Sequence, residues 1–143
     1  MNELNKKFLG KWTYRSFLND SEIYEDPKQF MENIIWGQGI LEITEVKDFQ
    51  IAGNLKFGEK YILDIKGRIS FGSPSEVRFV GIGQENTDAK GWIYDYHGYL
   101  APLWPTGIDQ KTTMTGTVIR TISHSNGNSK AGVNASFISV KHT

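Results

Sequence analysis

The side chains best suited to chemistry gather in residues 91–105, which read GWIYDYHGYLAPLWP. If this segment begins with a β-strand, alternation places Trp92, Tyr94 and Tyr96 on one face. Facing a cavity, the tyrosine hydroxyls would add a few directional hydrogen bonds to a mostly apolar wall. A second interpretation is that these aromatic side chains simply fill the core. The sequence does not decide which face of residues 91–100 points inward.

Asp95 and His97 lie two residues apart in the same segment and would share the opposite face. A carboxylate beside an imidazole raises the pKa of the histidine and can set up acid–base chemistry. The alternative is an exposed pair on an outer wall. The pattern therefore marks His97 as a candidate site residue without choosing between the two.

Arg120 and Trp104 complete the candidates. Arg120 follows Met114 and Val118 on one face of a predicted strand, so an inward guanidinium could hold a ligand carboxylate. Glu42 is the other strand charge that could face inward. Trp104 lies between two prolines in the loop 101–113, where it would either gate the mouth of a barrel or form a subunit interface in a homo-oligomer.

Composition narrows the function classes. The 16 basic and 16 acidic residues cancel, which argues against a nucleic-acid partner. The chain has no cysteine, its three histidines lack metal-ligand spacing, and no phosphate-loop, dinucleotide or Gly-x-Ser-x-Gly motif is present. We expect no cofactor and no metal. There is no run of about 18 apolar residues and no apolar signal segment in residues 1–7, so we expect a cytoplasmic protein without a membrane span.

The elements that would position these side chains are β-strands. Turn signals recur about every ten residues, and apolar residues alternate with period two between them. We predict strands over residues 11–18, 39–46, 49–57, 60–70, 76–84, 91–100, 113–123 and 133–140. Asp26 and Pro27 would open one short helix ending near Ile34.

Short hairpins between these strands predict an all-β fold: a single domain, residues 1–143, forming an eight-stranded antiparallel up-and-down β-barrel. The helix would lie in the insertion after the first strand. A two-sheet sandwich is the competing architecture. Alternation directs Tyr61, Leu63 and Ile65 inward on one strand, and Val77 and Phe79 inward on the next.

Two segments suggest a family. Residues 10–13, GKWT, resemble the Gly-x-Trp start of the calycin barrels, the lipocalins and avidins, and residues 130–141, KAGVNASFISVK, are similar to the last avidin strand. The resemblance implies a barrel with an internal ligand cavity. It also implies that Trp12 closes one end against a basic residue of a late strand, for which Arg120 is the candidate through a cation–π contact. The biotin-binding residues of avidin cannot be placed here, so the resemblance does not imply biotin.

These observations predict that a small, largely apolar or aromatic molecule binds in the barrel interior. The residues expected to line or gate the site are Trp12, Tyr14, Tyr61, Phe79, Tyr94, Tyr96, His97, Trp104 and Arg120. The main alternative is a cofactor-independent cyclase or isomerase, in which Tyr94, Tyr96 or His97 polarises a substrate carbonyl. A third possibility is a protein–protein module whose aromatic side chains lie outside a filled barrel.

Overall fold

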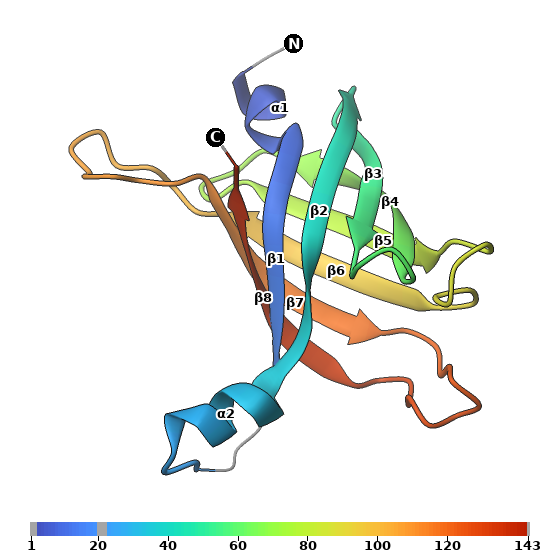
Figure 1. Ribbon diagram of the computed structural model, residues 1–143. Helices are drawn as coiled ribbons and strands as arrows, with labels where there is room; N and C mark the ends of the chain where they lie inside the picture. The colour runs from blue at the N-terminus through green and yellow to red at the C-terminus, as the bar shows by residue number, and fades with distance from the viewer. Residues whose placement is uncertain (1–2, 20–22, 143) are drawn as a thin grey trace.

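The computed structural model describes residues 3–19 and 23–142, which form a closed barrel of eight antiparallel strands (Figure 1). Each strand pairs with the next, and the last pairs with the first. The strands are β1 (Gly10–Leu18), β2 (Ile35–Lys47), β3 (Gln50–Lys56), β4 (Ile62–Ser70), β5 (Glu76–Gly83), β6 (Ile93–Leu100), β7 (Thr113–Arg120) and β8 (Asn134–Lys141). The predicted up-and-down barrel is confirmed, and closure rules out the sandwich.

The helix predicted after the first strand is also present. It is α2 (Pro27–Ile34), and the Asp26 side chain caps it by accepting a hydrogen bond from the backbone N–H of Lys28 at 2.9 Å. The described ranges also contain a second short helix, α1 (Glu3–Phe8), before β1, which was not predicted from the sequence. Its last residue, Phe8, is fully buried in the core. Residues 1–7 are mostly polar and lack the apolar periodicity that would have predicted this helix.

Strand alternation decides what fills the barrel. Tyr94 and Tyr96 are 7% and 4% exposed, so their face of β6 points inward. Glu42 lies between the buried Leu41 and Ile43 and therefore points outward, contrary to the sequence-based suggestion. The buried side chains that fill the barrel include Trp12, Tyr14, Leu41, Ile43, Leu55, Leu63, Ile65, Val77, Phe79, Tyr94, Tyr96, Met114, Val118 and Phe137.

Gly116 permits a close approach of neighbouring strands. It pairs with Gly98 across β6 and β7, and a Cβ atom at position 116 would overlap the backbone oxygen of His97. Only a residue without a side chain fits at this position without moving one strand away from the other.

The two ends of the barrel differ. At the end where β1 begins, α1 covers the interior, and the Trp12 indole N–H donates to the backbone oxygen of Phe8 at 2.9 Å. The ammonium group of Lys141, at the end of β8, donates a hydrogen bond to the backbone oxygen of Lys6 at 2.8 Å. The opposite end, from which α2 projects (Figure 1), is bounded by the β3–β4, β5–β6 and β7–β8 loops. Within the part of the chain that the structure describes, neither helix has the length and apolar character needed to cross a bilayer.

Candidate ligand-binding site

A cavity of about 510 Å³ opens at the end of the barrel that α1 does not cover. Its walls come from the last residues of β1 and β7, the first residues of β2 and β6, and the adjoining loops. Residues lining it include Tyr14, Ser16, Trp36, Phe57, Tyr61, Asp88, Trp92, Tyr94, Tyr96, Arg120 and His124. The volume falls within the range of ordinary small-molecule sites, which are likewise concave and largely aromatic.

Arg120 is the best-fixed polar group of the cavity. The residue is only 8% exposed, and its Nε–H donates to the hydroxyl of Tyr94 at 3.0 Å. One Nη1–H donates to the backbone oxygen of Lys130 at 3.1 Å, which ties the β7–β8 loop to the strand. The guanidinium carbon lies 4.9 Å from the centre of the Trp36 ring, within cation–π range. Arg120 is thus held in one orientation.

Tyr94 connects Arg120 to His124. The Tyr94 hydroxyl lies 2.7 Å from Nε2 of His124, and Nδ1 of that ring lies 2.9 Å from the Ser125 hydroxyl. Burial, and next the charge of Arg120, lower the pKa of His124 and favour a neutral ring. Because the Tyr94 oxygen accepts from Arg120, its proton is directed to Nε2 of His124, and the ring proton is assigned to Nδ1.

Tyr94 itself remains a phenol at neutral pH. Burial raises its pKa, although the hydrogen bond and charge of Arg120 oppose that rise. The network therefore offers a fixed cation, a phenol and a neutral imidazole side by side. Such a set can hold a polar ligand group by hydrogen bonds or polarise a carbonyl.

Stacked rings form one wall near the mouth. Tyr61 stacks on Trp92 with centroids 5.2 Å apart, and Trp92 stacks on His124 with centroids 4.2 Å apart. Tyr61 was predicted to point inward from a strand, but β4 begins one residue later, at Ile62, and Tyr61 is 36% exposed. It still lines the cavity, from the rim rather than from the strand.

The inner end of the cavity is closed by packed aromatic residues. Tyr96 stacks on Phe79 with centroids 4.6 Å apart, and Tyr14 meets the Tyr96 ring edge-on at 6.1 Å. Burial raises the pKa of both tyrosines, so they stay protonated. Tyr14 and Tyr96 line the cavity, whereas Phe79 supports Tyr96 and is not among the lining residues.

Two of the predicted tryptophans lie away from the cavity. Trp12 is fully buried at the closed end, and the expected contact with Arg120 is wrong, because Arg120 lies over Trp36 instead. The cross-strand neighbour of Trp12 on β8 is Lys141. Trp104 belongs to the β6–β7 loop, which projects from the same end of the barrel as α1 (Figure 1), opposite the cavity, and its side chain is 72% exposed. It therefore does not gate the cavity.

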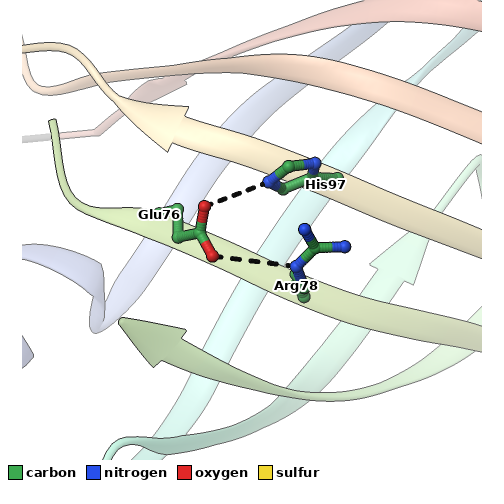
Figure 2. A network of polar contacts seen from close by, with 3 residues as sticks. All are labelled: Glu76, Arg78 and His97. Carbon is green, nitrogen blue, oxygen red and sulfur yellow. Dashed lines mark hydrogen bonds and ion pairs between the residues drawn. The ribbon is translucent and has the colours of Figure 1, made fainter. Parts of the chain in front are cut away.

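His97 lies on the outer wall. Its Nε2 is 3.3 Å from the carboxylate of Glu76, which is also 3.7 Å from Nε of Arg78 (Figure 2). Asp95, the partner predicted for His97, instead accepts a hydrogen bond from the hydroxyl of Thr121. The proposed acid–base pair is thus wrong, and the exposed-pair interpretation of this face is the one that the structure supports.

Sequence reasoning missed Trp36 and His124. The predicted second strand began at residue 39, whereas β2 starts at Ile35 and places Trp36 at the mouth. His124 was set aside because it lacks metal-ligand spacing. A usable signal was its position four residues after Arg120, in a loop that must lie at the same end of the barrel. Among the described residues, no group of three or more His, Cys, Asp or Glu side chains could hold a metal ion.

Comparisons of the chain with protein-family models, with curated proteins and with solved structures found no match. The interpretation of the cavity therefore rests on its own residues and geometry.

Proposed function

We propose that this protein binds a small, largely apolar or aromatic molecule in the cavity at the open end of the barrel. The observation that carries the proposal is the fixed Arg120–Tyr94–His124 network set into an aromatic-walled cavity of about 510 Å³. Apolar walls with a few oriented polar groups are typical of small-molecule sites. A cavity of this size also argues against a filled barrel that presents its aromatic residues outward.

We further propose that the barrel is calycin-like, of the lipocalin and avidin kind. Support comes from the closed end, where Trp12 is fully buried two residues after Gly10 and has the basic residue Lys141 as its neighbour on the last strand. In this proposal Lys141 takes the place first expected for Arg120. That leaves Arg120 free for a role at the opposite end.

Native mass spectrometry of the purified protein tests the binding proposal. We expect a mass excess that is lost on denaturation, and uptake of the neutral fluorescent probe N-phenyl-1-naphthylamine. Tyr94→Phe should weaken binding of the recovered compound, while Tyr99→Phe, a matched change on the exposed face of β6, should not. A clean apo mass together with no uptake of the probe would contradict the proposal.

A second candidate is cofactor-independent isomerisation or cyclisation in the same cavity. The observation favouring it is the 2.7 Å contact between the Tyr94 hydroxyl and the neutral His124 ring beside Arg120. An N–H group of Arg120 could polarise a carbonyl, while Tyr94 accepts a substrate proton as it passes its own proton to His124. Here His124 replaces His97, which lies outside. Incubation of the recovered compound with the protein should then yield a rearranged product, and His124→Gln should abolish turnover while His97→Gln preserves it. Recovery of the unchanged compound would exclude this candidate.

A further inference from the structure

We infer that the cavity selects a monoanionic ligand, an aromatic or otherwise apolar carboxylate whose charged group binds Arg120. The inference rests on the proposed function and specifies the class of its ligand.

The hydrogen-bond inventory of Arg120 is incomplete without a ligand. A guanidinium carries five N–H donors and stays protonated in proteins. Nε–H is taken by Tyr94, and one Nη1–H by the backbone oxygen of Lys130. The remaining three have no acceptor among residues 3–19 and 23–142, although the residue is only 8% exposed and lines the cavity. Free donors of a buried guanidinium in a cavity are suited to a planar oxyanion, which can bind two of them at once.

The charge of Arg120 also lacks a partner. In the described part of the chain, the ion pairs are Lys6 with Glu3, and Arg78 and His97 with Glu76, all remote from the cavity. Asp88 is the carboxylate among the lining residues, but it is exposed in the β5–β6 loop and makes no ion pair with Arg120. The free N–H groups of Arg120 face the cavity, so a bound carboxylate would supply the opposite charge that this largely buried cation lacks.

A purely structural role explains only part of this arrangement. Arg120 does tie down the Lys130 carbonyl and does stack on Trp36. Those contacts use one Nη1–H and the face of the guanidinium. They leave the second Nη1–H and both Nη2–H groups unused, so the structural role does not account for three of the five donors.

The surroundings limit the ligand to one negative charge on an apolar body. Among the described lining residues, Arg120 is the single lysine or arginine. His124 is neutral at neutral pH because burial lowers its pKa. Asp88 at the rim would repel a second negative charge. The rest of the wall is aromatic, with Trp36, Trp92 and Tyr61 near the mouth. A phosphate dianion or a dicarboxylate would therefore be undercompensated, whereas an aryl carboxylate matches both parts of the site.

A matched pair of probes tests the inference: 2-naphthoate and its neutral analogue 2-naphthamide, each displacing N-phenyl-1-naphthylamine at neutral pH. Hydrogen bonds to a charged group predict that wild-type protein binds the acid about 10-fold to 100-fold more tightly than the amide. Arg120→Gln should remove that preference while leaving the amide within about 3-fold of its wild-type affinity. Arg78→Gln, on the outer wall, should change neither.

Each outcome of this experiment either supports or overturns the inference. Equal affinities of wild-type protein for acid and amide would overturn the inference and leave the proposed function standing. Equal losses of acid and amide in a folded Arg120→Gln variant would overturn it as well, showing a structural arginine. Failure of wild-type protein to bind any of the three compounds, together with a clean apo mass, would refute the proposed function itself. If Arg120→Gln does not fold, Arg120→Lys replaces it in the test. Lysine retains the positive charge but cannot donate two parallel hydrogen bonds to a carboxylate, so it should reduce the preference for the acid without abolishing it.

Discussion

Replacing Trp12 by phenylalanine should destabilise the fold without touching the ligand cavity. The indole N–H donates at 2.9 Å to the backbone oxygen of Phe8, and both residues are fully buried. Losing the donor leaves a buried carbonyl unpaired, at a cost of about 1–3 kcal/mol. The smaller ring also leaves a void at the closed end, which adds about 1 kcal/mol. We therefore expect the free energy of unfolding to fall by about 2–4 kcal/mol.

Trp104→Phe is the matched control for this change. The Trp104 side chain is 72% exposed, and the hydrogen bonds of Trp104 to Gln110 use its backbone N–H and oxygen, which the substitution retains. Its effect should stay within about 0.5 kcal/mol. Urea unfolding followed by circular dichroism gives both values, with equal m-values as the check on the comparison.

The Trp12→Phe variant also tests whether Trp12 contributes to stability alone and not to ligand affinity. Under native conditions its affinity for N-phenyl-1-naphthylamine should equal that of the wild type, because Trp12 lies at the end opposite the cavity. A loss of stability below about 1 kcal/mol would show that the Phe8 carbonyl is not left buried and unpaired in the variant. A tenfold loss of probe affinity in the folded variant would refute the placement of Trp12.

Three further predictions concern single residues. Gly116→Ala should lower the free energy of unfolding by about 1–3 kcal/mol, because the added methyl group overlaps the backbone oxygen of His97; an unchanged melting temperature would contradict this. An NMR titration should give His124 a pKa below 6.5, since burial and then Arg120 lower it. Between that pKa and 6.5 the unfolded chain binds more protons than the folded one, so the contribution of His124 to the free energy of unfolding is complete above pH 6.5 and declines as the pH falls through this range. A pKa at or above 6.5 would contradict the buried environment described for His124. Finally, His97→Gln should leave probe affinity unchanged, and a tenfold loss would place this ring in the site.

Local patterns were sufficient to predict most of the framework. Period-two alternation identified the strands and placed Tyr94 and Tyr96 on one face, because a barrel wall buries every second side chain. The sequence did not decide whether that face points inward, and the burial of both tyrosines in the structure shows that it does. Asp26 followed by Pro27 marked the start of α2, since the aspartate caps and the proline fits the first turn. Both features depend on neighbours in the sequence, and such features can be predicted without knowing the tertiary structure.

The site was less predictable because it depends on which loops meet. Trp36 precedes the alternating part of β2 and His124 follows β7, so neither belongs to a periodic pattern. They come together only when the barrel closes. The same holds for α1, whose polar surface gives little sign that its last residue, Phe8, is buried beneath it.

The mistaken pairing of Trp12 with Arg120 shows what topology adds to alternation. In an antiparallel meander alternate strands run in the same direction, so β1 and β7 both start at the closed end. Trp12 is near the start of β1 and Arg120 is the last residue of β7, which places them at opposite ends although both face inward. Position along the strand, together with strand number, would have predicted this separation.

The same rule explains why the chemistry of this barrel gathers at one mouth. Residues that end an odd-numbered strand or begin an even-numbered one share the open end, as do the loops between them. Those contributing to the cavity include Ser16, Trp36, Tyr61, Trp92, Arg120 and His124. The opposite end is sealed by Phe8 and Trp12 and supplies packing instead. Because the two ends share few side chains, substitutions at the closed end should change stability, whereas substitutions of Arg120 should change ligand choice.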